Sequence, residues 1–142
     1  MKTLNTYLTF NGNCEEAFNF YKSVFGGEFS YLGRFGEMPD AENVPESAKD
    51  KIMHVSLQIS KETLLMGSDA SEEYGTVVTF GDNISLYLGA DTHEEVKSIF
   101  ERLSSGGTVT MPLEKTFWSP LFGMLTDKFG INWMLSVEEE MP

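Results

Sequence analysis

The sequence predicts an α+β fold in which two βαβββ modules form one domain of 142 residues. Three observations predict it. Several segments alternate apolar and polar residues as strands do. Two helical segments each follow a capping residue and end at a Gly-Gly pair. The same order of elements then occurs twice, which indicates an internal duplication. We place the first module at about 1–70, a connection at 71–82 and the second module at about 83–137.

Residues 3–10 begin the first module as a predicted strand, with Leu4, Leu8 and Phe10 on one side. After the turn Asn11-Gly12, Asn13 precedes Glu16 by three residues, which is the spacing of a capping box. We therefore predict a helix over 14–25 that ends at Gly26-Gly27. Its apolar residues recur at helical spacing and predict one buried stripe: Ala17, Phe20, Tyr21, Val24 and Phe25.

The rest of the first module reads as three strands with one long insertion. The strands are expected at 28–35, 52–59 and 63–69, and the last two form a hairpin. Residues 36–50 hold two prolines, five acidic residues and almost no large apolar side chains. They predict an exposed loop, either a lid over a binding site or a solvated excursion.

The second module repeats this order from residue 83. Residues 83–90 alternate, with Ile84 among the apolar positions, and Thr92 precedes Glu95 at capping-box spacing. The two predicted N-caps are 79 residues apart and the two glycine pairs are 80 apart. Three further strands are expected at 108–111, 121–126 and 131–137. The predicted buried stripe of the second helix is Val96, Ile99, Phe100 and Leu103, before Gly106-Gly107.

Composition and charge exclude several classes of function. A net charge of −12 argues against binding to nucleic acid or anionic membranes, because phosphates require clustered Lys and Arg. Arg34, Lys51 and Lys115 are the few candidates for holding an anionic substrate. One cysteine cannot form an internal disulfide, and no apolar run approaches the length of a membrane span. We therefore expect a cytoplasmic protein.

Several motifs, taken in order along nearly the whole chain, resemble the PhnB-like branch of the vicinal oxygen chelate superfamily. This superfamily includes glyoxalase I, extradiol dioxygenases and bleomycin-binding proteins. The resemblance implies paired modules that form a cupped mixed sheet, the glyoxalase/bleomycin resistance-type fold, in a homodimer. The motifs are Asn11 to Ala17, Phe20-Tyr21, Phe25 to Gly27, Met53-His54, Phe117-Trp118, Phe122-Gly123, Asp127 to Gly130 and Trp133 to Leu135.

Enzymes of this superfamily hold a divalent metal through His and Glu from the first and last strands of each module. The resemblance places Asn5, Met66, Ser85 and Met134 at or near those four positions. An amide, a hydroxyl and two thioethers are poor ligands for a hard or borderline cation. We therefore predict no standard metal site and no cofactor, although a divalent metal held in another way stays an alternative.

Some relatives carry a ubiquinone methyltransferase label. In this sequence no Gly-rich loop follows a strand with an acidic residue about 20 positions further on. The sequence therefore predicts no nucleotide-type cofactor fold.

His54 is the leading candidate for chemistry, because it lies on the polar face of its strand with Ser56 and Gln58. In a cupped sheet that face lines the cavity, so His54 would act as a general acid or base or would orient a ligand. A structural role, bonded to a neighbouring strand, is the alternative. The predicted ligand-binding residues are Tyr7, His54, Gln58, Met66, Tyr87, Trp118 and Met134.

Two other reactive side chains have plainer interpretations. Cys14 begins the first helix, where the helix dipole can lower a thiol pKa, but no base is evident near it. We expect it to be a small packed residue. His93 begins the second helix and is expected to be solvated.

Three functions follow from these expectations. The first is a dimeric protein that binds a small organic ligand in the cup without the standard metal. The second is an enzyme of the same fold that uses His54 as acid or base. The third is an interaction protein whose function lies in its dimer surface.

Overall fold

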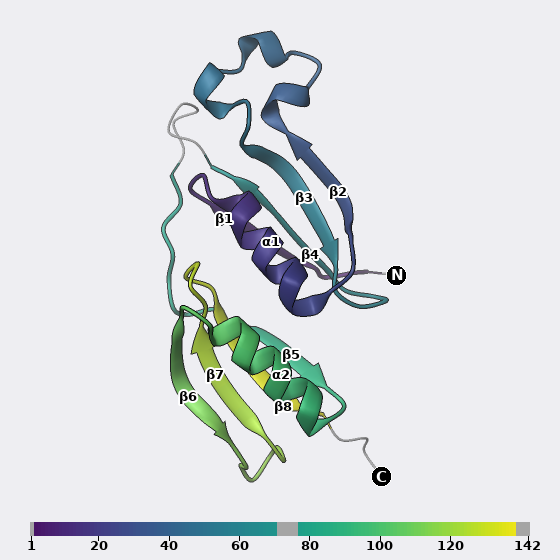
Figure 1. Ribbon diagram of the computed structural model, residues 1–142, viewed down its shortest axis with the longest axis vertical. Helices are drawn as coiled ribbons and strands as arrows, with labels where there is room; N and C mark the ends of the chain where they lie inside the picture. The colour runs from purple at the N-terminus through teal and green to yellow at the C-terminus, as the bar shows by residue number, and fades with distance from the viewer. Residues whose placement is uncertain (1, 71–76, 139–142) are drawn as a thin grey trace. The chain divides into compact units, whose positions relative to one another are not determined.

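The computed structural model describes residues 2–70 and 77–138 (Figure 1). The chain divides into two compact units, one up to Thr79 and one from Phe80 onward. Each unit contains one helix and one four-stranded sheet, and each is considered by itself.

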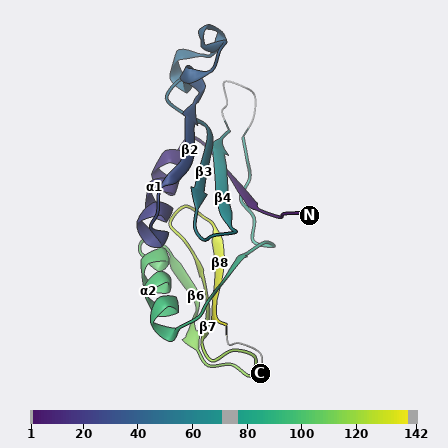
Figure 2. The same cartoon turned by 90° about the vertical axis from the view of Figure 1, so that its right-hand side faces the viewer.

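The first unit has the order β1, α1, β2, β3, β4. Its sheet has the strand order β1-β4-β3-β2, in which β1 is parallel to β4 and the other neighbours are antiparallel. Figure 2 shows α1 on one side of this sheet, and no other α-helix occurs among the described residues of this unit. The bounds are β1 Thr6–Phe10, α1 Cys14–Phe25, β2 Phe29–Arg34, β3 Ile52–Gln58 and β4 Leu64–Asp69.

The second unit repeats this topology with the strand order β5-β8-β7-β6, and β5 is parallel to β8. Pro112 lies in β6, at the edge of the sheet, where a residue without an N–H group does not interrupt an inner ladder. The bounds are β5 Leu86–Ala90, α2 His93–Ser104, β6 Thr108–Glu114, β7 Phe122–Thr126 and β8 Asn132–Val137.

The predicted α+β class and the βαβββ order of each module are confirmed. The predicted starts of β1 and β5, at residues 3 and 83, are wrong, because the alternating pattern in the sequence extends beyond the segments that pair in the sheets. Leu4 precedes β1 and is 99% exposed, and Ile84 precedes β5 and is 73% exposed. In the other direction, β6 continues to Glu114, three residues past the predicted end at 111.

Helix α1 has the predicted bounds but a different N-terminal cap. The Asn13 side chain makes no capping hydrogen bond. The Oδ1 atom of Asp69, at the end of β4, instead accepts from the backbone N–H groups of Gly12 and Cys14 at 3.0 and 2.9 Å. Its Oδ2 atom accepts from the N–H of Ile52 at 2.9 Å. A distant carboxylate has therefore replaced the local asparagine, and the predicted capping box is wrong.

The buried stripe of α1 also differs from the prediction. Phe18, which was not predicted, is fully buried, whereas Phe20 and Phe25 are only partly buried. A Cβ atom added at Gly67 would lie 2.6 Å from Cε1 of Phe18, so this glycine leaves the room in which the ring packs on the sheet. Gly67 thereby identifies the face of β4 that α1 covers.

The second helix is capped as predicted. Oγ1 of Thr92 accepts from the N–H of Glu95 at 3.1 Å. Val96, Phe100 and Leu103 are buried, and Ile99 is partly exposed. The turn between β7 and β8 depends on Asp127, whose carboxylate accepts from the N–H groups of Phe129 and Ile131 and from the Trp133 indole.

The acidic insertion is more ordered than an exposed loop. It contains three short 3₁₀ helices, Phe35–Glu37, Ala41–Asn43 and Glu46–Ala48. Val44 and Ala48 are buried, so the segment has apolar anchors of its own. Nothing in its contacts tests the lid hypothesis.

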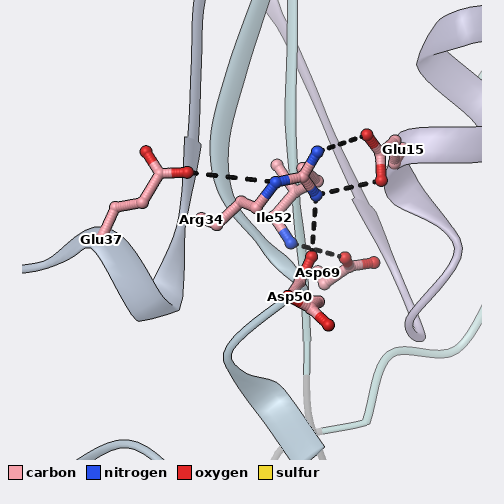
Figure 3. Close-up of polar contacts among 6 residues, drawn as sticks. All are labelled: Glu15, Arg34, Glu37, Asp50, Ile52 and Asp69. Carbon is pink, nitrogen blue, oxygen red and sulfur yellow. Dashed lines mark hydrogen bonds and ion pairs between the residues drawn. The ribbon is translucent and has the colours of Figure 1, made fainter. Parts of the chain in front are cut away.

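Arg34, at the end of β2, attaches the start of α1 to the sheet (Figure 3). Its guanidinium donates to both carboxylate oxygens of Glu15, at 3.0 and 2.5 Å, and to the carbonyl of Asp50 at 2.9 Å. The hydrogen bond and charge of Arg34 hold the pKa of Glu15 below its ordinary value. Lys51 is also occupied, because its ammonium donates to the carbonyl of Gly12 at 3.0 Å.

The carboxylate of Asp69 provides the first testable prediction. In Asp69→Asn the amide NH₂ group cannot accept the N–H of Ile52, so a buried donor loses its partner. We expect the free energy of unfolding to fall by about 2 to 3 kcal/mol. Urea denaturation measures this, with the exposed Asp40→Asn as matched control. Equal losses in the two variants would contradict the capping role.

The Glu15–Arg34 pair predicts a pH dependence. Because the folded-state pKa of Glu15 is lowered, the pair stabilises the fold above the ordinary Glu pKa of about 4.3 and loses this contribution as the pH falls through the lowered value. The Glu15 side chain is 45% exposed, so we expect an effect below about 1 kcal/mol. Stability curves of Glu15→Gln should lack this acid limb. Glu28→Gln, which breaks the more exposed pair with Lys22, should retain it.

Candidate functional site

The face of the first sheet opposite α1, here called the first open face, carries a row of four side chains. Tyr7 pairs with Met66, Met66 with Ser56, and Ser56 with Tyr31, so the row crosses all four strands. Directly paired residues project from the same face of a sheet. Met66 neighbours Gly67, which faces α1, so the row projects away from the helix.

His54 lies on the first open face, two residues before Ser56, between two tyrosine rings. The Tyr7 ring stacks on the imidazole with centroids 5.6 Å apart and planes 26° apart. The Tyr31 ring approaches it at 5.7 Å and 41°. The Tyr7 hydroxyl is 3.2 Å from Nδ1 of His54, so one nitrogen of the imidazole is hydrogen-bonded. Tyr7 and Tyr31 are 47% and 50% exposed, so both rings are accessible to a ligand.

A glycine permits this arrangement of rings. Gly33 on β2 is the register partner of His54 and lies two residues after Tyr31. A Cβ atom added at Gly33 would lie 2.6 Å from the Tyr31 hydroxyl oxygen. Because Gly33 has no side chain, the Tyr31 ring extends over it toward His54.

The first open face carries no formal charge around His54 in its two central rows. The row next to Tyr7, Met66, Ser56 and Tyr31 consists of Thr9, Ser68, His54 and Gly33. The two basic residues considered for an anionic substrate in this unit, Arg34 and Lys51, are bonded to Glu15 and Gly12. The arrangement therefore suits a neutral or cationic ligand better than an anion.

The second sheet has an equivalent face, opposite α2, here called the second open face. A Cβ atom at Gly123 would lie 2.8 Å from Cε2 of Phe100 on α2, so its neighbour Met124 projects to the other side. The row there is Tyr87, Met134, Met124 and Met111, each paired with the next.

Two further aromatic groups belong to the second unit. The Tyr87 hydroxyl donates to the carboxylate of Glu138, which raises the pKa of Tyr87. The Trp118 ring meets Phe122 edge-on with centroids 5.5 Å apart and is 55% exposed. Tyr87 and Trp118 therefore each have an accessible ring.

The structure brings five of the seven predicted ligand-binding residues together in two groups, and leaves Gln58 and Trp118 outside them. Tyr7 contacts His54, and Met66 lies beside Tyr7 on the first open face. Tyr87 and Met134 are register partners on the second. The Gln58 amide donates to the carbonyl of Lys61 in the hairpin turn at 3.0 Å. That all seven residues line one cavity stays a prediction.

Tyr31 was not among the predicted ligand-binding residues. The signal available in the sequence was its position two residues before a glycine in the strand that pairs with His54. Recognising it requires the register of β2 against β3, which shifts by one residue on either side of this segment.

The side chains at the four positions where the resemblance implies metal ligands do not fit a hard or borderline cation. Asn5 Oδ1 accepts from the N–H of Leu64 at 3.3 Å, and Met66 and Met134 offer thioethers. Within the described part of the chain, no three His, Cys, Asp or Glu side chains gather as metal ligands. These side chains therefore do not fit the divalent metal that the resemblance implies.

The two other reactive side chains belong to the helices and not to the strands that form the open faces. Cys14 is buried at the start of α1, and this burial, with the nearby Asp69 carboxylate, raises its thiol pKa. A thiol that resists ionisation is a poor nucleophile. His93 is the exposed first residue of α2.

Among residues 2–70 and 77–138, no helix has the length and apolar character needed to cross a membrane.

Comparisons with known proteins extend over nearly the whole chain. The family model described as 3-demethylubiquinone-9 3-methyltransferase matches residues 2–136. Protein YjdN of Escherichia coli (strain K12) is 36% identical, with 98% of this chain and 97% of that protein covered. The crystal structure of PA1353 from Pseudomonas aeruginosa is 38% identical with a TM-score of 0.86, covering 99% of this chain and 100% of that one.

Another solved structure carries the PhnB name. It is described as a putative 3-demethylubiquinone-9 3-methyltransferase, PhnB protein, from Bacillus cereus. It is 32% identical with a TM-score of 0.79, and 96% of this chain and 100% of that one are covered. A glyoxylase/bleomycin resistance protein/dioxygenase domain from Frankia sp. EAN1pec shares the fold, with a TM-score of 0.67 at 12% identity over 96% of this chain and 97% of that one. The chain therefore belongs to the PhnB-like, 3-demethylubiquinone-9 3-methyltransferase family.

Proposed function

We propose that this chain binds a small, planar organic molecule on the first open face, without the superfamily's standard metal. The observation that carries the proposal is the placement of His54 between two half-exposed tyrosine rings. Stacked aromatic faces with one central polar group are typical of sites that recognise planar ligands. The imidazole supplies the directional hydrogen bond, and the tyrosines supply the contact area.

Charge narrows the class of ligand. The net charge of the chain is −12, and the central rows around His54 contain no Lys or Arg. An anion would therefore lose its hydration without gaining a paired cation. A neutral phenol or an aromatic cation loses less free energy of hydration than an anion does. A cation is also attracted to the π faces of the tyrosine rings.

The family description is compatible with this class of ligand. The name of the Bacillus cereus protein refers to demethylubiquinone, whose quinone head is a planar ring with polar substituents and carries an isoprenoid tail. Binding of such a ring is the part of that description that the first open face supports. Our proposal does not extend to methyl transfer.

A second candidate function, acid–base catalysis, rests on the contact between Tyr7 and His54. When the Tyr7 hydroxyl donates to Nδ1, the proton of neutral His54 lies on Nε2, and the ring presents an acid to the ligand. When Nδ1 donates to the tyrosine oxygen, Nε2 presents a base. In both tautomers the Tyr7 hydroxyl occupies Nδ1 and orients the ring, which leaves Nε2 for the ligand.

The binding proposal is tested with three naphthalene probes that differ in charge: 1-naphthol, 1-naphthoate and 1-naphthylmethylammonium. We expect calorimetry to show that 1-naphthol and the ammonium bind at least ten-fold more tightly than 1-naphthoate. His54→Ala should weaken 1-naphthol about ten-fold, since one hydrogen bond contributes about 1 kcal/mol and packing adds to it. The exposed His93→Ala is the matched control and should leave binding unchanged. Preference for the anion, or equal binding by the two alanine variants, would contradict the proposal.

The acid–base candidate makes a separate prediction with 5-nitrobenzisoxazole. A base removes the proton from its ring carbon while the N–O bond breaks, which releases a coloured cyanonitrophenolate. We expect the wild type to accelerate this opening at least ten-fold over His54→Ala, with His93→Ala equal to the wild type. Tyr7→Phe should slow the opening, because it removes the hydroxyl that is hydrogen-bonded to Nδ1 and orients the imidazole. Equal rates for the wild type and His54→Ala would leave binding as the only function of the first open face.

A further inference from the structure

Three of the eight methionines in the chain form one continuous row on the second open face. Met134 on β8 pairs with Met124 on β7, and Met124 pairs with Met111 on β6. All three are partly exposed, so the row is accessible from solvent. The first open face differs, because there Met66 lies between Tyr7 and Ser56.

The spacing of this row lets three sulfur atoms meet. Directly paired residues have Cβ atoms about 4.5 to 5.5 Å apart, and each methionine has three rotatable bonds. Met124 is the central member, so Met111 and Met134 can each turn toward it from opposite sides. A set of three neutral thioethers can therefore form around one point above β7.

The chemistry of thioethers selects the occupant. Sulfur in methionine is a soft, uncharged ligand that favours Cu(I) over Mg²⁺ or Ca²⁺, which need carboxylate and carbonyl oxygens. Tyr87 ends the row beside Met134, and its ring adds an electron-rich face at that end. The donor set that fits a hard divalent metal poorly is therefore well suited to a soft monovalent cation.

We propose that Met111, Met124 and Met134 form a thioether site for a soft monovalent cation of the Cu(I) or Ag(I) class. The proposed ligands do not include His54, and the proposal does not depend on the proposed function. It involves neither His nor Cys, and the thiol of Cys14 is buried in the other unit.

Silver ion tests the proposal, because it is a soft monovalent cation that does not change oxidation state in air. Silver nitrate is titrated in chloride-free buffer into the full chain carrying Cys14→Ala, which removes the one thiol. The protein carries ¹³C-labelled methionine methyl groups. We expect binding of one ion per chain and shifts of the Met111, Met124 and Met134 methyl signals, with those of Met38, Met53 and Met66 unchanged.

Variants that conserve side-chain volume distinguish binding at the methionine row from binding of silver to any methionine of the chain. Met124→Leu should weaken silver binding at least ten-fold, whereas Met66→Leu, on the other sheet, should leave it unchanged. Shifts confined to methionines outside the row, or no binding at micromolar silver, would overturn the proposal. If Met124→Leu fails to fold, the methyl shifts of Met111, Met124 and Met134 in the Cys14→Ala chain still show whether silver binds at the row.

Discussion

The first unit depends on one carboxylate that three separate segments of the chain share. Asp69, at the end of β4, accepts N–H groups from the turn before α1, from the start of the helix itself and from the first residue of β3. A buried carboxylate with three such donors is well satisfied, and each donor would be costly to leave without a partner. Because His54 lies two residues after Ile52, the same carboxylate fixes the strand that carries the candidate site.

The two units have the same strand and helix order, but different side chains stabilise each unit internally. Thr92 caps α2 locally, whereas α1 is capped by Asp69 from a distant strand. The tight Asp127 turn supports the last strand of the second unit. What does recur is a Tyr–Met pair on the parallel strands, Tyr7 with Met66 and Tyr87 with Met134, on the face that no helix of the same unit covers. Both units therefore present an open face, which carries His54 in the first unit and the methionine row in the second.

Local patterns in the sequence predicted the helices and the order of strands, because caps, glycine stops and alternation are properties of neighbouring residues. These local patterns did not predict the features that depend on which strands pair and in which register. The cap at Asn13 was wrong because Asp69, far along the chain, offers a charged acceptor for the same N–H groups. Leu4 and Ile84 fit the alternation but have no strand partner. The approach of Tyr31 to His54 and the row of methionines follow from register, which one sequence does not determine.

The central claim is that His54, placed between Tyr7 and Tyr31, contacts the ligand. Long-range ¹H–¹⁵N correlation spectra of the histidine rings, recorded while 1-naphthol is added, test it most directly, because the chain has only two histidines. The account predicts that the ring nitrogens of His54 shift with saturation while those of His93 stay in place. Saturable binding of 1-naphthol with no change at His54 would contradict it.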